Sequence, residues 1–223
     1  MALRIFEVDP ESAPRPRQRF ADDIVGRFRS GYQISKRPAA LEKWRVTTGD
    51  PEVAARIAEL FGGEPQEWDA QGEDNLEVFT NVDKVKIILN GPGAVRQEMV
   101  LWGRTRPIRR CDGVEQHGEG DEGKPCECPS TLRARIEAAD AGKGCEPSTT
   151  IIFRLADDPD LGRFRFASGS WSLIKDLHGI EDRIAEFGGP VYAWLALAAV
   201  EIETAGQRRR FVKPVLDLIG PAT

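Results

Sequence analysis

The chain has 223 residues, of which 40% are hydrophobic and 30% are charged, a balance typical of a globular protein with a buried core. Its formal net charge of −5 excludes a general electrostatic attraction to nucleic acids or anionic membranes. No apolar run approaches the roughly 18 residues that cross a bilayer, and residues 1–10 (MALRIFEVDP) lack the pattern of a signal peptide. We therefore expect a cytoplasmic protein that does not interact with membranes.

In the first half of the chain, alternating apolar and polar residues predict strands, and one window has helical periodicity. Asp50 followed by Pro51 is typical of a helix start, and the apolar residues of Pro51–Phe61 recur at helical spacing until Gly62. The predicted strands are Leu3–Val8, Arg27–Ile34, Lys43–Thr48, Leu76–Thr80, Val85–Leu89 and Val95–Trp102.

The second half has a similar order, with a helix predicted over Trp171–Phe187. The segment RIAELFGG at 56–63 resembles RIAEFGG at 183–189, and each follows a strand and a turn of small residues. This similarity favours a duplicated β-α-β unit, although IAE followed by two glycines is also common at helix ends. We predict an α+β fold of pseudo-duplicated β-α-β units with an antiparallel sheet. The predicted strands here are Thr149–Leu155, Phe164–Ala167, Tyr192–Glu203 and Arg210–Ile219.

All four cysteines of the chain lie close together, at Cys111, Cys126, Cys128 and Cys145. Cys126 and Cys128 alternate on one side of a short extended segment, so their sulfurs can reach the roughly 3.8 Å separation of a tetrahedral zinc–thiolate site. The Gly- and Glu-rich spacer after Cys111 cannot form a core, and a bound metal would tie it down. We predict a structural Zn²⁺ site in an inserted module, residues 111–145, while residues 1–110 and 146–223 form one α+β body of two related halves.

Other interpretations of the cysteines stay open, including disulfides, free thiols and a catalytic metal. His117 lies between the first two cysteines and could replace one of them, but with four thiolates present we expect it to be solvated. A closed shell of four thiolates has no position for water, so such a metal would be structural. Within the module, a helix is predicted over Pro129–Ala141 with Leu132 and Ile136 on one apolar stripe.

The sequence lacks the common catalytic motifs. HExxH, GxSxG and GxxxxGK[ST] are absent, and the chain contains only two histidines, His117 and His178. We therefore predict that the protein is not an enzyme and has no small-molecule substrate.

Four stretches together suggest a family: Trp44–Gly63 (WRVTTGDPEVAARIAELFGG), the RRCDG run ending at Gly113, CECP at Cys126–Pro129, and Phe153–Trp171 (FRLADDPDLGRFRFASGSW). They resemble the recombination directionality factors of actinobacterial phages, the partners of large serine integrases of the type found in the phiC31 phage group. The resemblance extends from Leu3 to about Trp194.

The resemblance implies a non-enzymatic switch in the cytoplasm of a bacterial host. Such a factor binds a large serine integrase and redirects it from integration (attP × attB) to excision (attL × attR) by protein–protein contact. DNA would be engaged indirectly, through the integrase complex. The residues that we predict to bind the partner are Phe28, Arg29, Tyr32, Lys36, Arg37, Leu132, Arg135 and Ile136.

Two further classes of function stay open from the sequence. Phe28 and Tyr32 among basic residues could form a stacking groove of a zinc-stabilised phage early protein that binds single-stranded DNA during replication or repair. The acidic net charge counts against this alternative. A metal-dependent hydrolase is the third class, and no acid–base constellation supports it.

Overall fold

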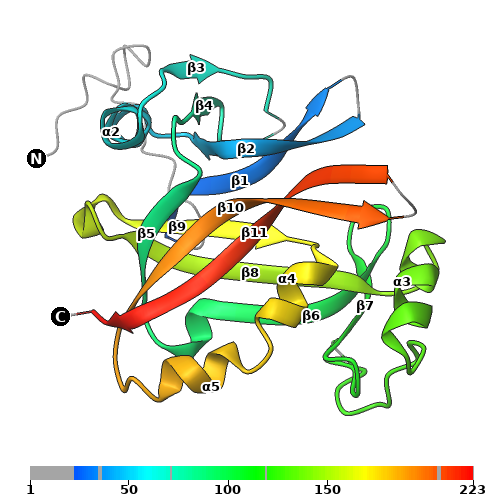
Figure 1. Cartoon of the computed structure of the whole chain (residues 1–223). Coiled ribbons are helices and arrows are strands. Elements are labelled where there is room, and N and C mark those ends of the chain that lie inside the picture. The colour runs from blue at the N-terminus through cyan, green and yellow to red at the C-terminus, as the bar shows by residue number, and fades with distance from the viewer. Residues whose placement is uncertain (1–22, 35–36, 71, 119, 205–206, 223) are drawn as a thin grey trace, which may run out of the picture.

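The computed structural model describes residues 23–222 apart from residues 35–36, 71, 119 and 205–206. The predicted strand Leu3–Val8 and the predicted binding residue Lys36 lie outside the described residues. The fold is α+β, as predicted, with many strands and few helices (Figure 1). The elements are β1 (Ile24–Ile34), β2 (Arg37–Thr48), α2 (Pro51–Phe61), β3 (Pro65–Glu67), β4 (Leu76–Phe79), β5 (Lys84–Leu89), η2 (Pro92–Ala94), β6 (Val95–Trp102), β7 (Pro107–Cys111), α3 (Leu132–Asp140), β8 (Glu146–Leu155), η3 (Pro159–Leu161), β9 (Arg163–Ser168), α4 (Trp171–Asp176), α5 (Ile180–Ala185), β10 (Val191–Thr204) and β11 (Gln207–Pro221).

The described strands form one mixed sheet in the order β11-β10-β5-β8-β9-β1-β2-β4-β3, and β6 and β7 branch from β8. Most neighbours are antiparallel, but β1 and β9 run parallel with Arg27 opposite Arg165. The predicted antiparallel sheet was therefore wrong at this pair, which joins segments far apart in the sequence. Figure 1 shows the β10–β11 hairpin crossing in front of β8 and β9, and both of its strands contact β2, so the sheet folds over on itself.

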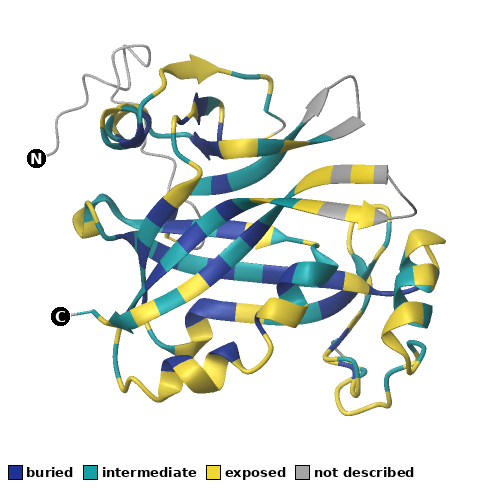
Figure 2. Cartoon of the chain, in the orientation of Figure 1, coloured by how far each residue is buried: buried dark blue, intermediate teal, exposed yellow. Residues whose placement is uncertain are grey.

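The hydrophobic core lies between these two layers, and alternation along the strands builds it. In β8 every second side chain from Pro147 to Leu155 is buried, and β10 has the same pattern from Val191 to Leu197 (Figure 2). Phe28 is only 2% exposed, and its ring packs edge-to-face against three other aromatic rings of the core. Its burial corrects the prediction that Phe28 contributes to a binding surface.

Local signals set the start of α2 as predicted. The side chain of Asp50 accepts a hydrogen bond of 2.8 Å from the backbone N–H of Glu52, and Pro51 occupies the first helical position. The predicted helix Trp171–Phe187 is instead two short helices, α4 and α5. Gly179 separates them in a left-handed conformation (φ 69°), which a continuous helix cannot contain. Among the described residues, no helix has the length and apolar character to cross a membrane.

The two proposed repeats differ in how the chain continues after the helix. After α2 the chain returns to β4, which pairs with β2, the strand that precedes the helix. After α5 it continues into β10, which pairs with β5 and β11 and not with β9. The duplication therefore stays a prediction based on sequence similarity, as does the division into a body and an inserted module.

Candidate metal centre and binding groove

Three cysteines form a compact cluster at the edge of the sheet. Cys111 is the last residue of β7, and Cys126 and Cys128 lie in the loop that precedes α3. The Sγ atom of Cys111 lies 3.3 Å from that of Cys126 and 4.0 Å from that of Cys128, and all three sulfurs are within 4.8 Å of one another. These separations are close to those of thiolates around one tetrahedral metal ion, and soft sulfur donors suit Zn²⁺. The three cysteines could therefore hold a metal.

Cys145 lies beside this cluster, immediately before β8. It is 2% exposed, and its thiol contacts the thiols of Cys128 and Cys111. It is outside the group whose sulfurs all lie within 4.8 Å of one another. The fold thus brings all four predicted ligands to one place, three of them at metal-binding separations.

The thiols of this cluster differ in acidity. Burial raises the pKa of Cys111, and it raises the pKa of Cys145 to about 11. Burial has the same tendency at Cys128, but hydrogen bonds from the thiol and backbone of Cys145 outweigh it and lower the pKa of Cys128. Of Cys111, Cys128 and Cys145, Cys128 therefore gives up its proton most easily, and a bound cation would favour ionisation of the other two.

Hydrogen bonds within the module fix the loops that carry the sulfurs. The Asp112 carboxylate accepts bonds of 2.7 and 2.8 Å from the backbone N–H groups of Val114 and Glu115. Arg135 of α3 donates to the carbonyl of Gly113 at 2.8 Å, which fastens the helix to the turn after the first cysteine. His117 is exposed and its Nε2 lies 3.4 Å from Asp112, so it is solvated on the loop as predicted.

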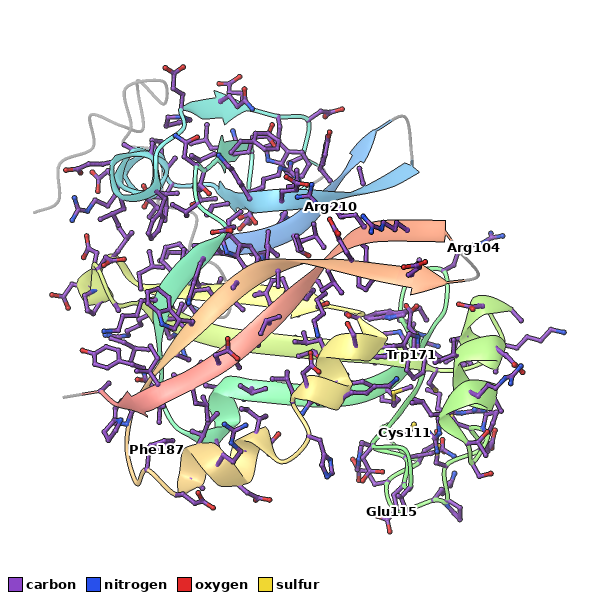
Figure 3. All side chains as sticks on the ribbon, in the orientation of Figure 1. Arg104, Cys111, Glu115, Trp171, Phe187 and Arg210 are labelled. Carbon is purple, nitrogen blue, oxygen red and sulfur yellow. The ribbon has the colours of Figure 1, made fainter. Side chains whose placement is uncertain are left out.

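The cysteine cluster is packed onto the body through a small apolar group. Met99 of β6 pairs directly with Cys111 and is buried with it, and Leu101 and Trp171 cover the same cluster. Trp171, at the start of α4, lies above the cysteine segment, while Glu115 lies at its far end, away from the body (Figure 3). The cysteine cluster is thus continuous with the sheet, and the rest of the segment extends outward.

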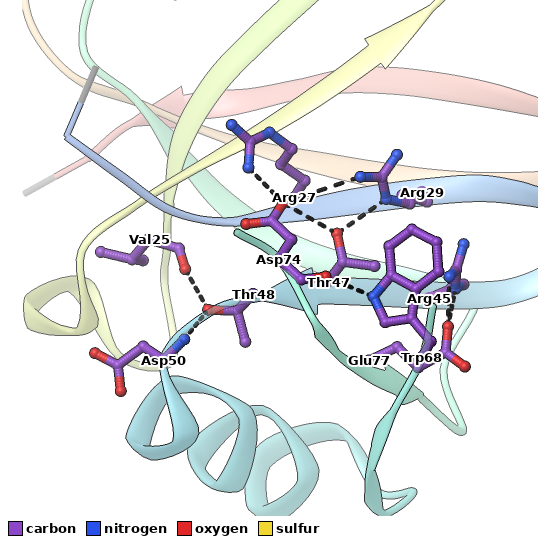
Figure 4. A network of polar contacts seen from close by, with 10 residues as sticks. All are labelled: Val25, Arg27, Arg29, Arg45, Thr47, Thr48, Asp50, Trp68, Asp74 and Glu77. Atoms are coloured by element: carbon purple, nitrogen blue, oxygen red, sulfur yellow. Dashed lines mark hydrogen bonds and ion pairs between the residues drawn. The ribbon is translucent and has the colours of Figure 1, made fainter. Parts of the chain in front are cut away.

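A second feature is a groove of about 1050 Å³ on the face of the sheet opposite the core. β1, β2 and β4 form its floor, and the connection from β3 to β4 brings Trp68 and Asp74 over one side (Figure 4). Its arginine and aromatic lining residues are Arg27, Arg29, Arg45, Arg165, Phe28, Tyr32, Trp68 and Phe79, although the Phe28 ring itself is buried in the core.

Ion pairs and one stacked tryptophan hold this groove together. Arg45 and Glu77 form a buried ion pair, with the Arg45 Nε atom 2.6 Å from the carboxylate. The Arg45 guanidinium also lies 4.4 Å from the ring centroid of Trp68, whose Nε1 donates to the backbone carbonyl of Asp74 at 2.5 Å. The Asp74 side chain in turn pairs with Arg27. Each contact thus restrains the next residue of the groove.

Arg29, which also lines the groove, is only weakly compensated by acidic groups. Its Nε donates to the Thr47 hydroxyl at 2.9 Å, and the nearest carboxylate oxygen, on Asp74, is 3.9 Å away. Burial, followed by repulsion from Arg45, lowers the pKa of Arg29. A guanidinium in this position favours the binding of an anionic ligand in the groove.

A model of the Gp3-like family, described as recombination directionality factor-like, matches residues 25–219. The chain belongs to this family. The match includes both the body and the cysteine segment, and it confirms the general resemblance predicted from the sequence. Proteins of this recombination directionality factor-like family are regulatory and not catalytic. No solved structure matches the chain.

In this recombination directionality factor-like protein, the predicted partner-binding residues fall into two places. Arg29 and Tyr32 line the groove, whereas the side chain of Arg37 is outside the described part of the chain. On α3, Leu132 is 39% exposed, Ile136 is half-buried, and Arg135 is engaged with the module. No observation favours the single-stranded DNA alternative over the regulatory one.

Sequence reasoning missed most of the groove. Trp68 lies over Arg45 on the outer face, and no regular pattern around it in the sequence predicts this position. The alternation of Arg27, Phe28 and Arg29 was the available signal, because it places Phe28 on the opposite face from both arginines. The family description specifies neither the class of recombinase nor the phage group, so these stay predictions.

Proposed function

We propose that this protein is a recombination directionality factor of an actinobacterial phage that binds a large serine integrase in the host cytoplasm. Bound to the integrase, it favours excision (attL × attR) over integration (attP × attB) by protein–protein contact, and it meets DNA through the integrase complex. The observation that carries this proposal is the match to the recombination directionality factor-like family over residues 25–219.

Within this proposal, Cys111, Cys126, Cys128 and Cys145 hold a structural Zn²⁺. When bound, such an ion supplies a fixed crosslink between thiolates and leaves no position for substrate or water. The short sulfur separations and the absence of a carboxylate from the compact cysteine group support this assignment. Met99 and Trp171 pack against the cysteine cluster and hold it against the rest of the protein.

The switch requires a surface that distinguishes two arrangements of the integrase. To convert an integrase population that strongly favours one arrangement into one that strongly favours the other, the protein must bind the second arrangement about 5 kcal/mol more tightly than the first. An interface of standard size can supply this difference in affinity. Two regions suit this role. One is the cysteine module, where Leu132 and Val114 are 39% and 73% exposed. The other is the groove that contains Arg29 and Tyr32.

An in vitro recombination assay with the cognate integrase tests the proposal. We expect added protein to increase attL × attR products and to suppress attP × attB products, with saturation as the integrase becomes fully bound. Unchanged product ratios at saturating protein would refute the proposal. A variant that lacks residues 112–141 tests the module separately, because unchanged capture of integrase by this variant would remove the module from the interface.

A further inference from the structure

One face of the sheet has a continuous band of arginines, which we call the arginine face. The pairing register establishes that they share this face: Arg29 is opposite Arg45, Arg27 is opposite Arg165, and Arg96 is opposite Thr150. Residues two apart on a strand point to the same side of the sheet. Arg163 therefore shares the side of Arg165 on β9. Arg154 shares the side of Ile152 on β8, and Ile152 is opposite Arg165. The arginine face consists of Arg27, Arg29, Arg45, Arg96, Arg154, Arg163 and Arg165.

The two ends of this face differ in charge. At the β2–β4 end, Arg27 and Arg45 pair with Asp74 and Glu77. At the β6–β8–β9 end, a hollow of about 130 Å³ is lined by three arginines, and none of its other lining residues is acidic. The residues lining this hollow are Asn90, Gly93, Ala94, Arg96, Ile152, Phe153, Arg154 and Arg163.

Positive charge is in excess at this second end. Within the described part of the chain, no carboxylate forms an ion pair with Arg96, Arg154 or Arg165; Arg165 reaches only the Thr150 hydroxyl, at 3.4 Å. Arg163 does have a partner, since it lies 3.2 Å from Asp23 at the edge of the face. Uncompensated guanidiniums beside a hollow favour a ligand that carries carboxylate or phosphate oxygens.

The paired end offers aromatic contact instead. Tyr32 and Phe79 meet edge-to-face with centroids 6.0 Å apart, and Phe79 is 36% exposed. Together with Trp68 they line the groove, whose lining also includes Asp69, and Glu73 lines a second hollow that shares Arg27, Arg29 and Trp68 with it. A ligand that crosses the face therefore meets an apolar and partly acidic region first and an arginine region second.

We propose that the arginine face binds an acidic peptide segment of a protein partner, with an apolar side chain at the aromatic end and carboxylates at the arginine end. This inference rests on the proposed function in taking the partner to be a protein. A nucleic acid fits less well, because it has a phosphate at every nucleotide and would place some of them against Asp69, Asp74 and Glu77. A peptide can place uncharged residues there.

The test compares R154Q/R165Q with K175Q/R183Q, which removes the same charge from exposed positions on α4 and α5. The probe is a short fluorescent peptide of alternating Glu and Leu, and fluorescence anisotropy measures its binding. We expect R154Q/R165Q to weaken binding about tenfold or more, and K175Q/R183Q to bind like the unmodified protein. The conservative variant R154K/R165K keeps both charges and should retain most of the binding, while thermal unfolding confirms that each variant is folded.

Several results would overturn this inference. The Glu–Leu peptide could fail to bind, or a Lys–Leu peptide could bind equally well. K175Q/R183Q could lose as much affinity for the Glu–Leu peptide as R154Q/R165Q does. An oligothymidylate could bind more tightly than the peptide, with R154Q/R165Q abolishing that binding. The recombination assay separates this inference from the proposed function. If R154Q/R165Q captured and redirected the integrase as well as the unmodified protein, the arginine face would be excluded as the docking site, and the proposed function would stand.

Discussion

The buried pair of Arg45 and Glu77 allows a quantitative prediction, because both side chains are almost fully enclosed, at 8% and 11% exposed. Two unit charges about 4 Å apart interact by about 4 kcal/mol at an effective dielectric constant near 20. Removing one partner leaves the other charge buried, and breaking such pairs costs about 3–5 kcal/mol. We therefore expect Glu77→Gln to lower the free energy of unfolding by about 3 kcal/mol, since the amide still accepts a hydrogen bond from Arg45 but does not compensate its charge.

Urea denaturation at neutral pH measures this loss. The matched control is Glu59→Gln, which breaks an ion pair with Arg56 at a position that is 71% exposed and should change stability by less than about 1 kcal/mol. The double variant R45M/E77Q should recover much of the loss, because neither partner is left charged and the Met side chain can still pack on Trp68. If E77Q unfolded within about 1 kcal/mol of the unmodified protein, or if R45M/E77Q were no more stable than E77Q, the pair would not have the assigned role.

Three further predictions concern the metal site and the backbone. Purified protein should contain one equivalent of zinc by elemental analysis. Cys111→Ser or a strong chelator should remove the zinc and expose residues 112–141 to proteolysis. If wild-type protein without zinc protected these residues equally well, the zinc assignment would be contradicted. Gly63→Ala should lower the free energy of unfolding by about 2–4 kcal/mol in urea denaturation, because φ is 89° at this position and the new Cβ would lie 2.1 Å from the carbonyl oxygen of Phe79. The control Gly93→Ala, whose new Cβ would have no atom within 4 Å, should change the free energy of unfolding little. Asp50→Ala removes the N-cap of α2 and should cost about 1 kcal/mol by thermal unfolding; no change would mean that the cap is dispensable.

Features set by neighbouring residues could be predicted from the sequence, and features set by distant contacts could not. Asp50 and Pro51 define the start of α2 by local chemistry, and the residues of 149–155 and 192–203 predicted strands where the structure has β8 and β10. The parallel pairing of β1 with β9 joins Arg27 to Arg165 and leaves no local signal. The predicted helix after Trp171 was too long, because its apolar periodicity continues past Gly179 although the backbone does not remain helical.

The same distinction applies to the candidate sites. The cysteine cluster was predictable because two of its members are separated by one residue and all four lie in one segment. The groove was not, because Trp68 reaches Arg45 from a connection without a regular sequence pattern, and Phe28 was assigned to the surface on the basis of its basic neighbours alone.

The position of the cysteine segment in the sheet has a consequence for how the protein can change. Met99 of β6 is opposite Cys111 on one side and Pro147 on the other, so the chain leaves and re-enters the body on the two strands that flank a single residue. Two strand spacings amount to roughly 10 Å, a gap that three or four extended residues can bridge. We therefore expect a linker of three or four residues to be long enough to join β7 to β8 in place of the segment between them.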